Sequence, residues 1–467
     1  AMVRESLRER QRLLQQTPHL VRPMRFLLAL GPESRRSALK VRIGLWLYRR
    51  LAGQTILTSD TRAEERQLEA LLDSGQRWSI FDYEDAQCEF PERLLAEWLV
   101  EAAEAGAVAR NYSQVLVVDV THGRAKGVLV RDLLSGKEER VEAGWIINAT
   151  GPWADRVCQR SQINTGGMMV GGVRGSHIVL PRFAGAPNAA VFTEASDRRP
   201  VFIIPWNEQL LVGPTEIPDQ GDPGRASPSD QEIEYLLNVV SQLFPGNTFS
   251  KADIRYSFAG IRPLPFARGK KADEITRRHI LHDHSKEGVQ RMISVIGGKL
   301  TTAGSLARQC ARAIGLKVDE PELTMVSHTG QMDAGLDDFI AELMAIPGFS
   351  ETGAEKIAEW HGKRTLPIVQ SVRSSPILRA SLCPHTEHIV GEAVEAFQHE
   401  YAVKLADVLL RRVPVALGPC WSSQCSEIAA AKIASAMGWS SAEMNSQLES
   451  FQSERQAFVG NPADAKE

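Results

Sequence analysis

A glycine pair followed by a lysine marks the stretch of this sequence best suited to chemistry. Residues 291–315 read RMISVIGGKLTTAGSLARQCARAIG, so an apolar run leads through Gly297, Gly298 and Lys299 into a helical pattern. Glycine lets the backbone approach a ligand closely, and a helix N-terminus offers unpaired N–H groups and a positive dipole end. Both features suit an electron-rich or anionic group. An ordinary strand–turn–helix corner, capped by one of the two threonines, explains the same pattern, so both interpretations stay open.

A second small-residue turn follows another apolar strand pattern. Residues 144–157 read GWIINATGPWADRV, in which the strand ends near Asn148 and a helix begins after Pro152. Small residues at the carboxyl end of a strand leave room for a flat ligand in the crevice of an α/β sheet. A capped strand–helix turn is again the alternative. The two turns lie on either side of a segment of short strands, and together they favour one shared crevice.

The composition places the chain among ordinary globular proteins. Of its 467 residues, 43% are hydrophobic and 24% are charged, and this length predicts roughly two to three domains. The net charge of −3 gives no reason to expect nucleic acid as a partner. Six scattered cysteines are too sparse for a disulfide scaffold and indicate a reducing cytoplasm. No apolar run approaches the ~20 residues that cross a membrane.

The elements that must position the two turns follow from hydrophobic periodicity. Helices are predicted at residues 3–16, 40–53 and 91–109. A hairpin is predicted over 114–132, with its turn at His122-Gly123. From 166 to about 290, short strands predict an antiparallel sheet, interrupted by one helix that Ser229 caps. After about residue 330 the chain turns helical, with candidate helices at 335–346, 387–412 and 425–439.

Five motifs in series resemble those of a known family. INATGPWAD, VRGSHIVLP, FAGIRPLPF, ITRRHIL and IGGKLTT occur in the order seen in FAD-dependent glycerol-3-phosphate dehydrogenases, which are D-amino-acid-oxidase-like flavoproteins. LRERQRLLQQTPHLVRPMRF and EAVEAFQHEYAVKLADVLLRR also resemble these enzymes, so the similarity covers nearly the whole chain. The resemblance implies an α/β plus α fold. An incomplete Rossmann-like FAD-binding domain would span residues 1–330, with an antiparallel-sheet substrate domain inserted at about 166–290. A C-terminal helical domain would span 331–467.

The family's reaction assigns roles to four side chains. The resemblance implies oxidation of sn-glycerol 3-phosphate to dihydroxyacetone phosphate, with electrons passing from FAD to quinone or oxygen. Arg262 suits a bidentate oxyanion contact, and Arg277 would clamp the phosphate. Lys299 would lie beside the flavin, and His177 would act as a base or hydroxyl partner. The structural alternatives are an ion pair for either arginine, a helix-start residue for the lysine and a satisfied core residue for the histidine.

The cofactor-binding residues implied by the resemblance lie in the two turns. They are Thr150, Gly151, Trp153, Gly297, Gly298, Leu300 and Thr301. The family begins with a strand, a GxGxxG turn and a helix that hold the FAD pyrophosphate, in about sixty to seventy residues that would precede Val3. The glycine-rich stretch 166–175 follows a loop and does not match that turn. We therefore expect weakened FAD binding.

Two other functions stay open. One is a related flavin oxidase of an amine or hydroxy acid, against which the paired arginines and GGKLTT argue. The other is a catalytically dead, truncated remnant that acts as a binding or structural protein, for which the lack of a GxGxxG turn argues. A smaller departure is VGPTE at 212–216, where relatives carry a GTTD-like turn. This departure affects how the site would position the substrate.

Five residues near the C-terminus raise the question of a metal site. Cys383, His385, His388, Cys420 and Cys425 lie in one predicted domain, and zinc accepts such ligands. Their spacing matches no CxxC pair, and Cys425 is expected on a helix. The sequence therefore predicts no metal site.

The remaining expectations concern partners and location. Residues 40–53, KVRIGLWLYRRLAG, carry basic flanks around an apolar centre and form either a packed helix or a helix on a membrane surface. The expected partners are a phosphorylated small molecule, quinone or oxygen as electron acceptor, a membrane surface and a second copy of the chain, but no nucleic acid. The expected location is the cytoplasm, peripheral to the inner face of the membrane.

Overall fold

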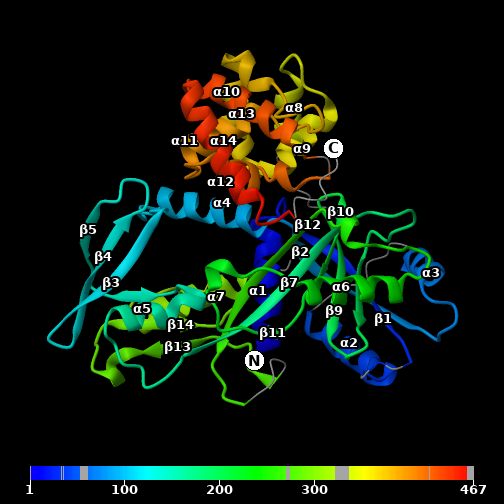
Figure 1. Cartoon of the computed structure of the whole chain (residues 1–467), viewed down its shortest axis with the longest axis horizontal. Helices are drawn as coiled ribbons and strands as arrows, with labels where there is room; N and C mark the ends of the chain where they lie inside the picture. Colours follow the sequence, from blue (N-terminus) through cyan, green and yellow to red (C-terminus); the bar gives the residue numbers. More distant parts are fainter. Residues whose placement is uncertain are drawn as a thin grey trace.

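A large, mostly antiparallel sheet dominates the N-terminal two thirds of the molecule (Figure 1). The computed structural model describes residues 2–32, 34, 36–52, 61–269, 274–320, 336–419 and 421–459. Within them, the sheet has eight strands: β11 (Ile217–Pro218), β7 (Val170–Pro181), β10 (Gln209–Gly213), β9 (Pro200–Trp206), β8 (Ala190–Glu194), β1 (Val21–Leu30) and β2 (Ser79–Cys88), with β12 (Tyr256–Pro265) also paired with β7.

The sheet extends beyond the predicted range of about 166–290. Two strands from the N-terminal part join it, because β1 pairs in parallel with β8 from Phe26 and Ala190 onward, and β2 pairs with β1. At the other end of the range, β13 (Ile280–Asp283) leaves the large sheet and pairs with β14 (Met292–Ile296). The predicted antiparallel sheet therefore forms, but its edges are set by pairings between distant segments.

The helix α6 (Asp230–Leu243) covers one face of this sheet. Its predicted cap is confirmed: the hydroxyl of Ser229 accepts from the backbone N–H of Glu232, whose carboxylate accepts from the backbone N–H of Ser229. Leu236 and Val240 on the inner side of α6 are fully buried. Alternate residues of β7 point away from α6, which leaves the second face of the sheet for other contacts.

The second sheet carries the two predicted turns. It has the order β13-β14-β6, with β6 (Ile146–Asn148) parallel to β14. The predicted strand 292–296 is confirmed and is wholly buried. The 3₁₀ turns η1 (Gly151–Trp153) and η6 (Leu300–Thr302) follow β6 and β14 and lead into α5 (Ala154–Arg160) and α7 (Ala303–Ala313). Both turns thus lie at the carboxyl ends of neighbouring parallel strands.

A third sheet and four helices complete the part before residue 320. β3 (Ser113–Thr121), β4 (Arg124–Asp132) and β5 (Glu138–Glu142) form this sheet, and the predicted hairpin turns at His122 and Gly123, both with positive φ. The helices are α1 (Met2–Gln16), α2 (Ala38–Ala52), α3 (Thr61–Leu71) and α4 (Pro91–Glu104). The short 3₁₀ segments are η2 (Pro223–Arg225), η3 (Lys251–Asp253) and η5 (His284–Glu287).

The helix α2 packs through one side only. Val41, Leu45 and Tyr48 are half-buried, and the Tyr48 ring meets that of Tyr83 edge-on at 6.0 Å. The other side leaves large apolar side chains in solvent, with exposed fractions of 65% for Leu39, 57% for Ile43, 60% for Trp46 and 51% for Leu47. The predicted helix is confirmed, but packing does not account for the exposed apolar side. None of the described helices has the length and apolar content needed to cross a membrane.

Helices make up the described C-terminal residues from 336 to 459, coloured yellow to red in Figure 1. They are α8 (Leu336–Met344), α9 (Glu351–His361), α10 (Thr365–Ser374), α11 (Val390–His399), α12 (Leu405–Asp407), the π-helical η9 (Val408–Arg412), α13 (Ser423–Met437) and α14 (Ser441–Arg455), with 3₁₀ segments η7 (Gly362–Arg364), η8 (Pro376–Arg379) and η10 (Val415–Leu417).

The prediction of one helix over 387–412 is wrong. α11 ends at His399, and Tyr401 has a φ of 60°, which interrupts the helical path. Helical structure begins again at α12. The carboxylate of Asp407 accepts from the backbone N–H groups of Val403 and Lys404, each at 2.9 Å, and thereby caps α12.

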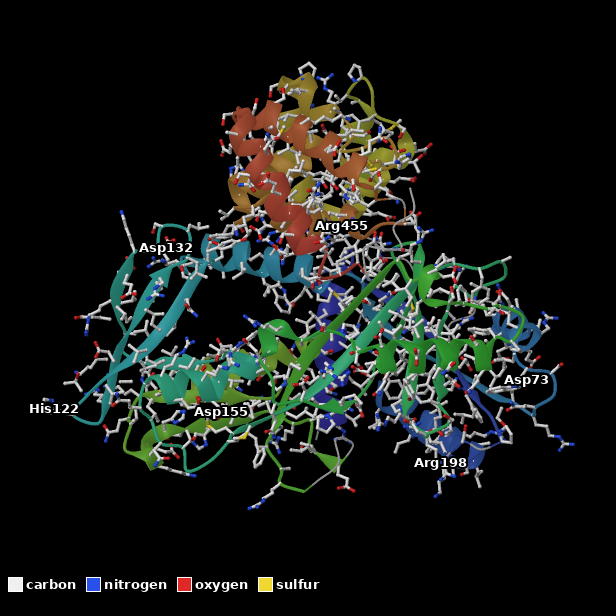
Figure 2. All side chains as sticks on the ribbon, in the orientation of Figure 1. Asp73, His122, Asp132, Asp155, Arg198 and Arg455 are labelled. Carbon is white, nitrogen blue, oxygen red and sulfur yellow. The ribbon has the colours of Figure 1, made fainter. Side chains whose placement is uncertain are left out.

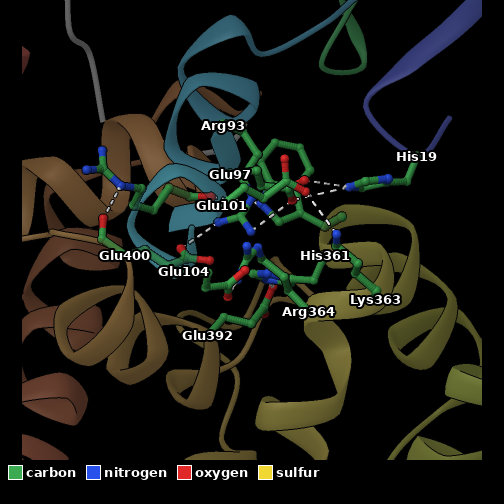
Figure 3. Close-up of polar contacts among 12 residues, drawn as sticks. His19, Arg93, Glu97, Glu101, Glu104, His361, Lys363, Arg364, Glu392 and Glu400 are labelled. Atoms are coloured by element: carbon green, nitrogen blue, oxygen red, sulfur yellow. Dashed lines mark hydrogen bonds and ion pairs between the residues drawn. The ribbon is translucent and has the colours of Figure 1, made fainter. Parts of the chain in front are cut away.

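A buried network of charges joins the two parts of the fold (Figure 3). Arg93 of α4 is fully buried and donates to Glu400 at 2.5 Å and to Glu97 at 3.1 Å. A ring nitrogen of His19 lies 3.0 Å from the Glu97 carboxylate. In the helical part, a ring nitrogen of His361 lies 2.9 Å from Glu392. The C-terminal helices are therefore tied to α4 by pairs that water does not reach.

Candidate active site

The two small-residue turns are locked together through the strands that precede them. Asn148 at the end of β6 pairs with Ser294 of β14, and its side-chain amide donates to the Ser294 hydroxyl and to the Ala154 carbonyl, each at 3.1 Å. The Thr150 hydroxyl donates to the Asn148 side-chain oxygen at 2.7 Å. The sequence analysis placed Asn148 only as a strand end, and the structure makes it the residue that shapes the first turn.

Both turns converge on Pro263 of β12. A Cβ built on Gly151 would lie 4.0 Å from Pro263 Cγ, and one built on Gly297 would lie 3.7 Å from the Pro263 carbonyl oxygen. Gly151, Gly297 and Gly298 have φ values of 57°, 76° and 109°, a region that side chains other than glycine rarely adopt. The backbone therefore favours glycine at these three positions, and the glycines add no side chain of their own to this edge of the sheet.

The other predicted cofactor residues surround this edge. Trp153 and Leu300 are 40% and 39% exposed, and Thr301 is half-buried in the 3₁₀ turn η6. The predicted helix begins as this single 3₁₀ turn and becomes α-helical at Ala303. Thr302, at the N-cap position of α7, makes no side-chain capping bond. This result does not match a corner capped by Thr302, because the first N–H groups of α7 receive no capping bond from that side chain.

A carboxylate in α5 connects the first turn to the large sheet. Asp155 accepts from the backbone N–H groups of Met169 and Val170, each at 3.0 Å. Figure 2 labels Asp155 in the region of α5 and the second sheet. The turn at Thr150-Gly151 therefore has a fixed position relative to β7, which carries His177.

His177 and Arg262 lie on the face of the sheet that points away from α6. His177 pairs across the strands with Phe258, and their rings stack at 5.2 Å with 18° between the planes. The Arg262 guanidinium lies over Gly175, where an added Cβ would be 2.6 Å from Nη2. The structure thus places these two predicted residues on the same face of the paired strands β7 and β12, with the Arg262 guanidinium over Gly175, two residues from His177.

His177 is not a core histidine with all its hydrogen bonds made. Its Nδ1 is buried and has no hydrogen-bond partner among the described residues. Burial, with a smaller contribution from the positive charge of Arg262, lowers the pKa of His177 to about 4. The ring is therefore neutral at pH 7 and can accept a proton.

The two predicted arginines share one carboxylate. Glu216 Oε1 lies 2.5 Å from Arg277 Nη2 and 3.7 Å from Arg262 Nη1. Arg262 also donates to the Thr215 carbonyl at 3.3 Å. Burial lowers the pKa of Arg262; Glu216 opposes this shift, and Arg277 adds to it. The cluster of Arg262, Glu216 and Arg277 has a net charge of +1, which favours an anionic ligand. Glu216 was missed as a site residue, although VGPTE was noted as a departure.

A cavity of about 1370 Å³ opens beside this cluster. Glu216 and Arg277 line it, together with residues of α2 and of the strands β8 and β9, and Arg198, labelled in Figure 2, lies on its wall. The basic side chains on the wall are Arg36, Lys40, Arg198, Arg199 and Arg277. Its size exceeds the ~300–1,000 Å³ usual for small-molecule sites, so it can admit a phosphorylated polyol.

Lys299 is not brought into this cluster. Its side chain is exposed, and within the described residues no hydrogen bond or ion pair to its ammonium is found. Its carbonyl accepts from the backbone N–H of Thr302 at 3.0 Å, so the residue has a structural part in η6. Its predicted place beside a flavin stays a prediction.

The residues weighed as metal ligands separate into two groups. Cys383, His385 and Cys425 bring their ligand atoms within 4.8 Å of one another. His388 instead directs Nδ1 to the Glu392 carboxylate at 2.8 Å, and Cys420 lies outside the described residues. The sequence analysis argued against a metal site because the spacing matches no CxxC pair. Cys383, His385 and Cys425 nevertheless lie close enough in space to share an ion.

Comparison with known proteins decides the family. Residues 1–303 match the model of the FAD dependent oxidoreductases, and residues 291–444 match the C-terminal domain of alpha-glycerophosphate oxidase. The chain belongs to the FAD dependent oxidoreductase family. The resemblance predicted from five motifs is therefore confirmed, and so is the fold class, with its C-terminal helical part.

Relatives of this oxidoreductase carry informative names. A glycerol-3-phosphate dehydrogenase of Synechocystis sp. is 33% identical over 89% of this chain and 78% of the relative. The aerobic glycerol-3-phosphate dehydrogenase of Escherichia coli is 29% identical over 88% of this chain and 81% of the relative. The fold is similar to that of the glycerol-3-phosphate dehydrogenase from Bacillus halodurans complexed with FAD, with a TM-score of 0.75, 21% identity and coverage of 98% of this chain and 86% of that one.

Proposed function

We propose that this chain oxidises sn-glycerol 3-phosphate to dihydroxyacetone phosphate, with FAD as cofactor and quinone or oxygen as electron acceptor. One observation carries the proposal: the two glycine turns meet at Pro263, and the preceding residue, Arg262, belongs to the cluster with Glu216 and Arg277. The two turns and the anion-binding cluster therefore meet the same stretch of β12. The names of the relatives support the choice of substrate.

The described residues fit the flavin end of FAD. Gly151, Gly297 and Gly298 present bare backbone at one sheet edge, and the first turn of α7 lacks a side-chain cap. We assign the contacts at this edge to them and to Thr150, Trp153, Leu300 and Thr301. When bound, FAD supplies the hydride acceptor. The 467 residues contain no G-x-G-x-x-G turn, so we assign the pyrophosphate to no residue of this chain.

The chain's own residues bind the substrate and move its proton. Arg262 and Arg277 hold the phosphate through charge-assisted hydrogen bonds, with Glu216 orienting both guanidinium groups. His177, neutral at pH 7, accepts the hydroxyl proton at Nδ1 as the neighbouring carbon loses its hydride. Lys299 lies next to the second turn, where its ammonium would favour negative charge on a reduced flavin.

The proposal also covers a membrane contact, the location of the protein, the boundary between its two domains and a second copy as partner. We assign membrane-surface contact to the exposed apolar side of α2, which is flanked by Lys40, Arg42, Arg49 and Arg50. With this assignment we propose the inner face of the membrane, in the cytoplasm, as the location of the protein. We also propose a domain boundary at about residue 330. In the described residues the last strand ends at Ile296, and the helices of the C-terminal part begin at Leu336. A second copy of the chain stays a prediction as partner.

Anaerobic flavin reduction tests the proposed function. The 467-residue chain is mixed with saturating FAD and then with sn-glycerol 3-phosphate, and bleaching of the flavin absorbance is followed. We expect reduction by glycerol 3-phosphate and none by glycerol, which lacks the phosphate. Reduction by an amino acid instead would favour the related oxidases, and no reduction by any of these compounds would contradict an enzymatic role.

A further inference from the structure

Three side chains that commonly bind metals converge at the N-terminus of α13. Cys383 and His385 come from the loop between η8 and α11, and Cys425 lies in the first turn of α13. Their ligand atoms all lie within 4.8 Å of one another, and Cys425 Sγ is 3.5 Å from His385 Nδ1. His385 and Cys425 are 40 positions apart in the chain, so the fold of the helical part creates this arrangement.

The distance between sulfur and nitrogen matches the edge of a metal-centred tetrahedron. With metal–sulfur bonds of about 2.3 Å and metal–nitrogen bonds of about 2.0–2.1 Å, tetrahedral geometry separates the two ligand atoms by about 3.5–3.6 Å. The 3.5 Å between Cys425 and His385 falls on this value. An ion could therefore enter without a large movement of either side chain.

We propose that Cys383, His385 and Cys425 bind a thiolate-preferring divalent cation of the zinc class. Two sulfur ligands and one imidazole nitrogen select zinc over calcium or magnesium, which require oxygen ligands. Binding forms two metal–sulfur bonds and one metal–nitrogen bond, and the two thiols release their protons to solvent.

The surroundings of the three residues suit such a site. Cys383 and Cys425 are 0% and 2% exposed, whereas His385 lies at the surface. The thiolates would approach the ion from the core and the imidazole from outside. A cavity of about 340 Å³ borders the site and is lined by Cys383 and His385, and also by Asn207 and Glu208 of the β9–β10 hairpin. Three protein ligands leave a fourth position for water or for another donor that enters from this cavity.

Neighbouring groups are already engaged elsewhere. His388 directs Nδ1 to Glu392 at 2.8 Å, and Trp421 donates its indole N–H to Ser426 at 2.8 Å. We therefore leave His388 out of the ligand set. The ion would link the loop at Cys383 to α13, and so stabilise the contact between these two parts of the helical domain.

Metal content and affinity of the full 467-residue chain test the proposal. The chain is purified, dialysed and analysed for zinc, iron, calcium and magnesium by mass spectrometry, and Zn²⁺ affinity is measured by competition with a chromogenic chelator. The test variants are Cys425→Ser and His385→Gln. The matched controls are Cys310→Ser, a buried cysteine of α7, and His399→Gln, an exposed histidine of α11.

We expect one equivalent of zinc in the parent chain and in both controls. Loss of a ligand should weaken Zn²⁺ binding by at least about tenfold, since even residues behind the ligands contribute 10–100-fold. Co²⁺ should give a thiolate charge-transfer band in the parent chain that Cys425→Ser weakens. If Cys425→Ser does not fold by circular dichroism, His385→Gln decides, because its side chain lies at the surface. Absence of zinc binding, equal affinity in all variants, or iron in place of zinc would overturn the assignment.

Discussion

Arg277 Nη2 lies 2.5 Å from Glu216 Oε1, so the arginine predicted to clamp a phosphate already holds a carboxylate. The same oxygen lies 3.7 Å from Arg262 Nη1. A substrate phosphate would compete with this carboxylate for the guanidinium groups. Glu216 therefore sets the strength of anion binding as well as the orientation of the two arginines.

Substitutions in this cluster should have opposite effects on substrate affinity. Arg262→Ala should lower kcat/KM for glycerol 3-phosphate by at least about tenfold, because a charge-assisted contact contributes roughly 1.5–3 kcal/mol. Glu216→Gln should lower KM, since it removes the competing charge. Arg160→Ala, an exposed arginine of α5, serves as the control. Unchanged steady-state kinetics in Arg262→Ala would remove this residue from the site.

The pH dependence of the reaction should identify His177. Because its pKa in the folded chain is about 4, the base form persists down to about that pH, and kcat/KM should keep an acid limb near pH 4 rather than near 6.5. His177→Gln should remove that limb and lower kcat, whereas His399→Gln should do neither. An acid limb near neutral pH in the parent chain would contradict this assignment.

The same shift predicts a pH dependence of stability. The folded pKa of His177 lies below the ordinary value of 6.5, so the unfolded chain binds the proton more readily. The contribution of His177 to the free energy of unfolding should therefore be constant above pH 6.5 and decrease as the pH falls toward 4. Urea titrations of the parent chain and His177→Gln between these values would measure the difference.

The second glycine turn should control flavin binding. FAD titration of the 467-residue chain, followed by flavin fluorescence, should give a dissociation constant above the micromolar range, because no GxGxxG turn is present in these residues. Gly298→Val should weaken binding further, by at least about tenfold: φ is 109° and the added Cβ would lie 3.3 Å from Leu306, at a cost of about 1–3 kcal/mol for the backbone alone.

Two further variants separate backbone strain from a flavin contact. Gly315→Val imposes a similar conformation, φ 88°, at the end of α7, where nothing lies within 4 Å, and it should leave the FAD affinity unchanged. Lys299→Met should retain binding but lower the flavin potential and slow its reduction by substrate. Equal FAD affinity in Gly298→Val and the parent chain, with an unchanged potential in Lys299→Met, would leave the turn as a simple strand–helix corner.

Removal of Arg93 should strongly destabilise the fold. Arg93→Met leaves Glu400 buried without its arginine partner and leaves Glu97 with His19 alone, which should lower the free energy of unfolding by about 3–5 kcal/mol. Lys363→Met removes an exposed pair with Glu101 and should cost less than about 1 kcal/mol. Similar denaturant midpoints for the two variants would contradict the buried network.

The effect of Arg93→Met should depend on pH. Burial alone would raise the pKa of Glu400, but the charge and hydrogen bond of Arg93 outweigh it and hold this pKa below 4.5. A lowered carboxylate pKa stabilises the fold above the unfolded value, and this contribution is lost as the pH falls through the folded value. The difference between parent and variant should therefore be full at pH 7 and shrink below about pH 4.5.

The exposed side of α2 should attach the protein to anionic vesicles. Trp46→Ser should lower the fraction that floats with such vesicles by at least about tenfold, because burial of a large apolar side chain contributes roughly 1.5–3 kcal/mol. Leu133→Ser, which changes a similarly exposed apolar side chain after β4, is the control. Salt should weaken attachment, since each basic residue near the surface contributes about 1 kcal/mol. A parent chain that fails to float at low salt would exclude this surface.

The sequence by itself determined the features that depend on neighbours along the chain. The strand 292–296, the cap at Ser229 and the turn at His122-Gly123 were predicted correctly, because period, capping chemistry and glycine conformation act within a few residues. The tertiary structure alone decided the pairing of β1 with β8, the placement of Glu216 between two arginines, and the approach of Cys383 to Cys425. Those contacts join residues tens to more than a hundred positions apart, and only the simultaneous packing of several elements brings them together.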